Sequence, residues 1–269
     1  MRPPRRDRDG TQDVTPIKSD VVDFQSRAPE TSSVFEEIGE HTVSGMSSTL
    51  EAFMTQGSMQ AESFRLLRAK VQNLAAEQAF RCIGLVSSTS GEGKSTMALG
   101  LATALAHEPR NRILLIDADL RKSSIGHYLG LPEGPGLAEW LSGVRATVPI
   151  TRVLPQGFFL LSAGTARMSQ PDQLTTDRLP MLLGMARRLF DFVILDCPPV
   201  LPVADAVILQ DHLDGFLFVV RAAQSPRETV LRALSHLRPN LVQGVIFNDF
   251  RELVSSYHSY AFRQYGEYR

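Results

Sequence analysis

Beyond residue 80 the chain alternates short apolar runs with longer segments of helical periodicity. The runs are rich in β-branched and aromatic side chains, as buried strands are. The predicted strands are 82–86, 112–116, 158–161, 192–195, 216–220 and 242–247. The predicted helices between them are 94–106, 178–190, 203–210 and 226–237. Such alternation, with strands apolar on both faces, predicts an α/β fold with a mostly parallel central sheet flanked by helices on both faces.

A further helical pattern begins at about Ser58, before the first predicted strand. Its apolar positions recur every three or four residues and form one stripe: Phe64, Leu67, Val71 and Leu74. Three charged residues spaced three apart fall off this stripe: Glu62, Arg65 and Arg68. An amphipathic helix is therefore expected here.

Residues 1–57 show no sustained period of either kind. They mix arginines and aspartates with Pro, Ser and Thr, a composition typical of disordered segments. We interpret them as a disordered leader, and a short docking segment is the alternative that the sequence leaves open. The predicted organisation is this leader, one folded domain over 58–250 and a flexible tail over 251–269.

Composition and charge narrow the class of protein. Of the 269 residues 43% are hydrophobic, enough for one full core, and a formal net charge of −1 gives no excess that would direct the chain to nucleic acid. The two cysteines, Cys82 and Cys197, suit a reducing compartment. Residues 1–30 lack the apolar core of a signal peptide, and no apolar stretch is long enough to span a bilayer. A cytoplasmic protein is expected, with any membrane contact made through a partner.

The first predicted strand is followed by a loop with the features of a phosphate-binding site. It runs Ser-Ser-Thr-Ser-Gly-Glu-Gly-Lys-Ser-Thr over 87–96, and a helical run follows at once. Its main-chain N–H groups can surround a phosphate, Lys94 can reach the β- and γ-phosphates of ATP, and the Ser95 hydroxyl can bind Mg²⁺. Ser88 replaces the first glycine of the usual pattern. ATP and Mg²⁺ are the predicted cofactors, and the predicted binding residues are Ser90, Gly91, Glu92, Gly93, Lys94, Ser95 and Thr96.

Three aspartates follow two other predicted strands. Asp117 and Asp119 come just after 112–116, and Asp196 comes just after 192–195. Carboxylates beside buried strands are costly unless something satisfies them, and a magnesium nucleotide would do so. We interpret Asp196 as the carboxylate that holds the metal. The predicted metal ligands are Ser95, Asp117 and Asp196.

A carboxylate that accepts a proton would assist phosphoryl transfer to tyrosine, because the phenol has a pKa of about 10. Asp117 is the candidate base, and Asp119 either shares Mg²⁺ or holds Asp117 and Arg121 in position. Arg121 either neutralises charge near the phosphates or forms a structural salt bridge to one of these aspartates. The predicted catalytic residues are Lys94, Asp117, Asp119 and Asp196.

The C-terminal segment gathers four of the five tyrosines of the chain: Tyr257, Tyr260, Tyr265 and Tyr268. Their spacing, with polar residues between them, is a poor pattern for a core strand and suits a flexible segment. Beside a site that binds ATP, we predict these tyrosines to be phosphoacceptors. The alternative is an aromatic tail that packs on its own domain or on a partner.

These motifs together resemble the bacterial tyrosine kinases that regulate capsule and exopolysaccharide production. The loop 87–96 is similar to their Walker A motif, 113–121 to their Walker A′ motif with its Asp-x-Asp-x-Arg ending, and 193–198 to their Walker B motif. Glu62, Arg65 and Arg68 match the Glu-x-x-Arg-x-x-Arg element through which the family oligomerises. The resemblance runs from about residue 60 to the C-terminus.

The resemblance implies a P-loop fold and a protein-tyrosine autokinase. This kinase phosphorylates its own C-terminal cluster between subunits of a homo-oligomer such as a ring. It also implies a separate membrane adaptor with an activating cytosolic tail, an opposing phosphatase, and a role in polysaccharide synthesis. Added phosphates repel one another, so we expect unphosphorylated chains to assemble and modified chains to separate.

Two other functions stay open at this stage. The main rival is a non-catalytic, ATP-dependent switch or assembly protein of the MinD/ParA type. A positioning ATPase is disfavoured because that branch carries an extra lysine where this chain has Thr89. The six histidines share no metal-ligand spacing, so no zinc or other transition-metal site is expected.

Overall fold

The computed structural model describes residues 34–43, 58–165 and 173–249. Most of the predicted leader and the four predicted phosphoacceptors, Tyr257, Tyr260, Tyr265 and Tyr268, lie outside these ranges. Among the described residues, none of the helices has both the length and the apolar character that crossing a bilayer requires.

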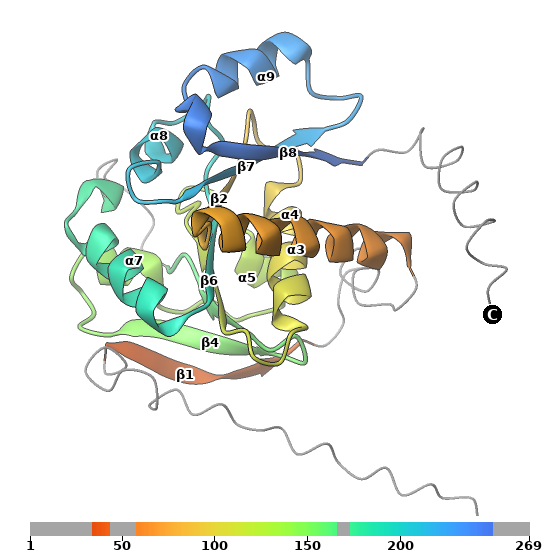
Figure 1. Cartoon of the computed structure of the whole chain (residues 1–269). Coiled ribbons are helices and arrows are strands. Elements are labelled where there is room, and N and C mark those ends of the chain that lie inside the picture. The colour runs from red at the N-terminus through yellow and green to blue at the C-terminus, as the bar shows by residue number, and fades with distance from the viewer. Residues whose placement is uncertain (1–33, 44–57, 166–172, 250–269) are drawn as a thin grey trace, which may run out of the picture.

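Within the described ranges the strands form a single eight-stranded sheet in the order β1-β4-β5-β3-β6-β2-β7-β8 (Figure 1). Neighbouring strands are parallel except for β4 and β5, which are antiparallel. The strands at its centre are buried on both faces, which explains their unbroken apolar runs. The bounds are β1 Phe35–Thr42, β2 Cys82–Ser87, β3 Ile113–Asp117, β4 Val148–Leu154, β5 Phe158–Leu161, β6 Phe192–Asp196, β7 Gly215–Arg221 and β8 Val242–Asn248.

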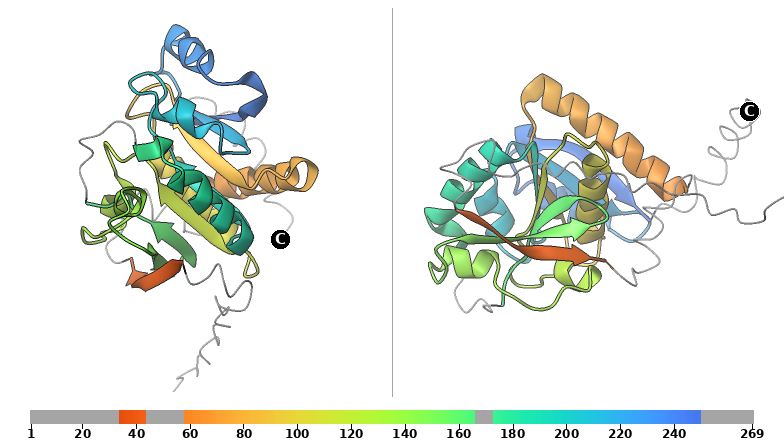
Figure 2. Two further views of the ribbon diagram at one scale, coloured as in Figure 1. Left: turned by 90° about the vertical axis from the view of Figure 1, so that its left-hand side faces the viewer. Right: turned by 90° about the horizontal axis from the view of Figure 1, so that it is seen from below.

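Helices cover both faces of this sheet, as the alternating pattern predicts. Figures 1 and 2 show α7 on one face and α3 with α4 on the other. Two apolar clusters correspond to these faces, one including side chains of α6 to α9 and the other side chains of α3 to α5. The bounds are α3 Met59–Gln78, α4 Lys94–Ala106, α5 Ile125–Tyr128, α6 Leu137–Leu141, α7 Arg178–Leu189, α8 Asp205–Leu209 and α9 Arg227–Leu234, with short 3₁₀ turns at Gln173–Thr175 and Pro239–Leu241.

The predicted amphipathic helix is α3. Its first turn is capped by Ser58, whose side chain accepts a hydrogen bond from the Ala61 amide at 3.0 Å. Phe64 is buried against α4, at a point where a side chain on Gly100 would collide with its ring. The predicted apolar stripe is therefore the face of α3 that packs against α4.

The predicted disordered leader is wrong over residues 35–42, which form β1. This strand pairs in parallel with β4, about 110 positions later in the chain. Most of its side chains are exposed, so it lacks the apolar period that would reveal a strand. Polar contacts to Glu36 from Arg145 and Thr147 fix it in place, and the sequence gives no local sign of them. Residues 1–33 and 44–57, the remainder of the predicted leader, lie outside the described ranges.

The segment 148–154 was not predicted as a strand, yet it forms β4. It runs antiparallel to β5, and the two are joined by a short turn that contains Gly157 at a φ of 84°. Polar residues Thr151 and Arg152 interrupt its apolar pattern, because its outer part is only half-buried. The other predicted strands and helices are confirmed, with ends that differ by a few residues.

Candidate active site

The predicted phosphate loop connects the buried strand β2 to the N-terminus of α4. Gly91 and Gly93 have φ values of 88° and 91°, which glycine adopts without steric cost. Gly93 is the N-cap of α4, and its carbonyl accepts a hydrogen bond from the Met97 amide at 2.9 Å. The free amides and the positive dipole end of a 13-residue helix therefore face the loop. This arrangement can hold an anion such as a phosphate.

A cavity of about 140 Å³ lies beside this loop. One wall is the loop itself, from Ser87 to Thr96. The opposite wall comes from the segment after β3 and includes Asp119, Lys122, Ser124 and Tyr128. The cavity therefore lies at the carboxyl ends of the parallel strands, where ligands of such sheets bind.

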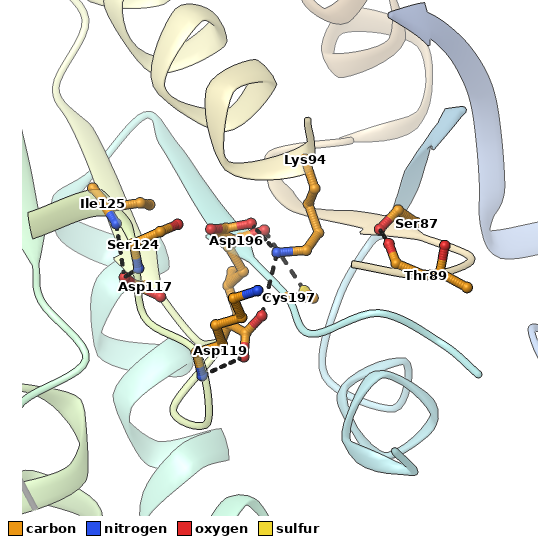
Figure 3. A network of polar contacts seen from close by, with 11 residues as sticks. Ser87, Thr89, Lys94, Asp117, Asp119, Ser124, Ile125, Asp196 and Cys197 are labelled. Carbon is orange, nitrogen blue, oxygen red and sulfur yellow. Dashed lines mark hydrogen bonds and ion pairs between the residues drawn. The ribbon is translucent and has the colours of Figure 1, made fainter. Parts of the chain in front are cut away.

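Lys94 points from the first turn of α4 toward the carboxylates at the ends of β3 and β6 (Figure 3). Its Nζ lies 2.6 Å from Asp196 Oδ1 and 3.6 Å from Asp119 Oδ2. Burial alone lowers the pKa of Lys94, but the nearby charges of Asp196 and Asp119 and the hydrogen bond to Asp196 raise it above its ordinary value. Lys94 is therefore a buried cation held by two carboxylates.

Asp117 lies at the end of β3, next to Asp196 in the register of the sheet. One of its oxygens, Oδ2, accepts hydrogen bonds of 3.2 Å from the main-chain amides of Ser124 and Ile125 (Figure 3). Burial, and then the charge of Asp196, raise the pKa of Asp117 from 3.8 to about 7. A carboxyl group with such a pKa can take up and release a proton near neutral pH.

The residues of the site fit a magnesium nucleotide. Among the described residues, Asp117 Oδ1 and Asp196 Oδ2 are buried oxygens that have no hydrogen-bond partner. Burial raises the pKa of Asp196, whereas the charge of Lys94 and hydrogen bonds from Lys94 and Ser95 favour its ionised form. No group of three or more His, Cys, Asp and Glu residues in the described part of the chain could hold a metal by itself. The two free oxygens and the Ser95 hydroxyl are nevertheless the hard ligands that Mg²⁺ uses together with water and phosphate oxygens.

Glu92, in the middle of the loop, forms a network that sequence analysis did not foresee. Its carboxylate accepts hydrogen bonds from the Ser88 hydroxyl at 3.0 Å and from the Thr89 amide at 2.9 Å. It also contacts the hydroxyl of Ser225, after β7. Ser88 therefore stands at the usual glycine position because its side chain helps to hold the loop. Glu92 was predicted as a nucleotide-binding residue, and its side chain acts within the loop.

The C-terminal end of β8 is fastened to the same loop. The side-chain amide of Asn248 donates to the Glu92 carbonyl at 2.9 Å. Arg221, at the end of β7, pairs with Asp249 at 3.0 Å and donates to the Gly91 carbonyl at 3.4 Å. The two contacts to the loop join residues 130 and 156 positions apart, so periodicity and local motifs could not reveal them.

Two other residues near the site have partners or surroundings that the sequence did not indicate. Arg121 pairs with Asp205 at 3.0 Å, an aspartate on α8 that was not among the predicted partners. The Cys197 thiol is fully buried, and this burial raises its pKa well above the ordinary value. A buried thiol of this kind is not a reactive thiolate.

The predicted oligomerisation residues lie on α3. Glu62 and Arg65 form an ion pair of 2.9 Å, with side chains that are 51% and 57% exposed. Arg68 is partly buried and donates to the Ala104 carbonyl of α4 at 3.3 Å. The first two are thus available at the surface, whereas Arg68 has a contact within its own domain.

Comparison with known proteins identifies relatives of this chain. A family model described as ATPase MipZ matches residues 81–208. Tyrosine-protein kinase YwqD of Bacillus subtilis is 30% identical over 65% of this chain and 74% of its own length. The succinoglycan biosynthesis transport protein ExoP of Rhizobium meliloti is 32% identical over 72% of this chain.

Solved structures agree with these sequence relationships. The BceF tyrosine kinase domain is 31% identical, with a TM-score of 0.65 over 84% of this chain and 87% of that domain. The long relatives extend far beyond the matched region. This chain spans only 25% of the length of ExoP and 28% of the length of EpsB from Ralstonia solanacearum.

Proposed function

The chain belongs to the bacterial tyrosine kinase family, and on this basis we propose that it transfers the terminal phosphoryl group of ATP to tyrosine side chains. The observation that best supports the proposal is the pairing of Lys94 with Asp196 and Asp119, beside Asp117, which is opposite Asp196 in the register of the sheet. Lys94 and Asp119 line one cavity together with the other residues of the loop, whose main-chain amides can bind phosphates.

Each residue has a distinct part in the proposed reaction. The main-chain amides from Ser90 to Thr96 bind the phosphates, and Lys94 neutralises the charge of the terminal ones. To do so, Lys94 exchanges its contact with Asp196 for the phosphate oxygens. Ser95 and Asp196, with Asp117 nearby, are the residues that would hold Mg²⁺. Bound Mg²⁺ supplies positive charge to the β- and γ-phosphate oxygens.

Asp117 is the proposed base for the acceptor hydroxyl. Its raised pKa, about 7, lets it accept a phenolic proton and release it again near neutral pH. Its free oxygen, Oδ1, would receive this proton while Ser95 and Asp196 hold the metal, because one oxygen cannot serve as metal ligand and base together. Asp119 contacts Lys94 and receives a hydrogen bond from the Lys122 amide at 3.1 Å. Both contacts suit a residue that positions the loop after β3.

We further propose that the acceptors are Tyr257, Tyr260, Tyr265 and Tyr268, and that transfer occurs between subunits. The exposed pair Glu62 and Arg65, with Arg68, is the proposed contact of a homo-oligomer such as a ring. Each phosphate adds about −1.5 to −2 charges at pH 7, so a fully modified cluster would repel itself and separate the chains.

The wider role we propose is the control of exopolysaccharide or capsule synthesis. One long relative is named for succinoglycan biosynthesis transport, and another, EpsB, is named a putative tyrosine-protein kinase. A membrane adaptor with a cytosolic activating tail would recruit the chain to the inner face of the membrane. A phosphatase would remove the phosphates.

A second candidate is an ATP-dependent switch that does not modify tyrosine. The match of residues 81–208 to the ATPase MipZ model favours it. The occupation of position 89 by Thr instead of lysine favours the kinase.

Mass spectrometry of the C-terminal peptide would separate the two functions. The purified chain is incubated with ATP and Mg²⁺, beside Lys94→Met, Asp117→Ala and the exposed control Glu133→Ala. The kinase proposal expects phosphate on the C-terminal tyrosines of the wild type and the control, and none in the other two variants. ATP hydrolysis with unmodified tyrosines would favour the switch. Light scattering before and after full phosphorylation tests the separation of chains, and an equal mass would contradict it.

A further inference from the structure

Tyr128 is the one tyrosine within the described residues, and it lines the nucleotide cavity. It lies at the C-terminal end of α5, with 40% of its surface exposed. It shares its wall of the cavity with Asp119, Lys122 and Ser124, opposite the phosphate loop. Sequence analysis gave it no role, because it belongs to none of the recognised motifs.

The backbone of Tyr128 is held in place by the proposed base. The amides of Ser124 and Ile125, at the start of α5, both donate to Asp117 Oδ2. The Ile125 side chain is fully buried beneath them. On the other side, His41 Nε2 donates to the Leu129 carbonyl at 2.8 Å. The ring of Tyr128 is therefore attached to a short segment that is fixed at both ends.

The wall that carries Tyr128 faces the end of the cavity where transfer would occur. Asp119 on this wall lies 3.6 Å from the Nζ of Lys94, the residue that reaches the terminal phosphates. Asp117, whose carboxylate binds the start of α5, belongs to the same segment. An acceptor hydroxyl must approach Asp117 and the terminal phosphate together. Tyr128 and Asp119 line the same cavity, so the ring of an acceptor that enters there can meet the ring of Tyr128.

We propose that the ring of Tyr128 is a contact surface for the phenol ring of the incoming acceptor tyrosine. This inference rests on the proposed kinase function and adds an acceptor-specificity residue to it. Aromatic rings favour one another in offset or edge-to-face arrangements, beyond the effect of burial alone. A half-exposed ring at the cavity rim offers such a surface to an aromatic acceptor and little to a serine or threonine.

Substitutions at Tyr128 test this role in a chain whose four C-terminal tyrosines are changed to Phe. A synthetic peptide of residues 255–269 is then the acceptor, and Tyr128 is the only tyrosine left in the enzyme. Tyr128→Phe keeps the ring, and Tyr128→Leu removes it but keeps apolar bulk. Glu133→Ala, at an exposed position shortly after α5 that does not line the cavity, is the control.

The expected result separates acceptor binding from the other steps. Tyr128→Leu should raise the KM for the peptide by about 2- to 10-fold, the range that one aromatic contact gives. Its kcat and its KM for ATP should change by a smaller factor than the KM for the peptide. Tyr128→Phe and Glu133→Ala should match the parent chain.

Three results would overturn the inference while leaving the kinase proposal intact. They are an unchanged KM in Tyr128→Leu, an equal loss in Tyr128→Phe, and phosphate found on Tyr128 itself in the parent chain. A rise in the KM for ATP instead of the peptide would also overturn it, since Tyr128 would then contact the nucleotide. If the wild-type chain transfers no phosphate to any tyrosine, the kinase proposal itself fails.

Discussion

The ammonium group of Lys94 lies 2.6 Å from Asp196 Oδ1, so the cation of the phosphate loop is paired with the carboxylate at the end of β6. The side chain of Asp196 is fully buried, and that of Lys94 is 7% exposed. A buried charge that loses its partner is strongly destabilising. Lys94 thus has a structural effect in addition to its proposed role in binding phosphate.

Replacing Lys94 with Met should destabilise the chain even in the absence of nucleotide. The change leaves Asp196 and Asp119 without their cation, at a cost of about 3–5 kcal/mol. The double variant Lys94→Met/Asp196→Asn should recover much of this loss, because no unpaired charge remains at Asp196. Urea unfolding without ATP or Mg²⁺ measures the free energy of unfolding of both variants. If Lys94→Met unfolds at the same urea concentration as the wild type, loss of the buried ion pair does not destabilise the folded chain. Neither variant should bind ATP with the affinity of the wild type.

Replacing Asp117 with Asn should change how stability depends on pH. The pKa of Asp117 rises from 3.8 to about 7 on folding, so between these values the folded chain holds a proton that the unfolded chain has released. The wild type therefore loses stability from this group as the pH rises toward 7, by up to roughly 4 kcal/mol. Asp117→Asn does not titrate, and its stability relative to the wild type should increase from pH 5 to pH 8.

Unfolding in metal-free buffer at several pH values measures this difference between Asp117→Asn and the wild type. Glu133→Gln, at an exposed position, serves as the control. A constant difference across this range would mean that Asp117 is already ionised in the folded chain.

Replacing Gly93 with Ala should be more harmful than replacing Gly91. Both glycines have a positive φ near 90°, which costs a residue with a Cβ about 1–2 kcal/mol. At Gly91 the new methyl group would meet nothing, whereas at Gly93 it would collide with the side-chain amide of Asn248. Gly93→Ala should therefore lose more stability and more ATP affinity than Gly91→Ala.

The double variant Gly93→Ala/Asn248→Ala isolates the collision. Compared with Asn248→Ala alone, it should show only the loss seen in Gly91→Ala, as measured by unfolding midpoints. Equal effects of Gly93→Ala in both backgrounds would exclude a contribution from Asn248.

Replacing Arg65 with Glu should separate the subunits of an oligomer without unfolding the chain. Arg65 is 57% exposed, and its pair with Glu62 is a surface contact of little energetic value. The helix should therefore tolerate the change at a cost of a few tenths of a kcal/mol. Light scattering should show a lower mass than that of the wild type. Lys70→Glu, an equal change of charge at another exposed position of α3, should keep the wild-type mass. An equal fall in both variants would point to general charge repulsion.

The sequence could predict those parts of the fold in which neighbours along the chain carry the information. The run of apolar residues in β2, the two glycines and Lys94 at the start of α4 together define the phosphate loop. Asp117 and Asp196 could be assigned to one edge of the sheet, because each follows a buried strand.

What the sequence could not predict depends on contacts between distant segments. Arg121 has its partner Asp205 on α8, and Asn248 reaches Glu92 from the last strand. Tyr128 belongs to no motif and gains its position only because α5 is bound to Asp117. Local periodicity contains no information about such pairings.

The strand β1 also has a consequence for the solubility of the protein. It covers β4, whose buried Val148, Ile150 and Val153 would otherwise lie beside a row of unpaired main-chain groups. Its own outer side carries acidic residues, and like charges discourage a second sheet from joining there. A chain shortened to begin at Ser58 would expose β4 as an apolar edge strand. We expect this shortened chain to aggregate at concentrations at which the full chain does not.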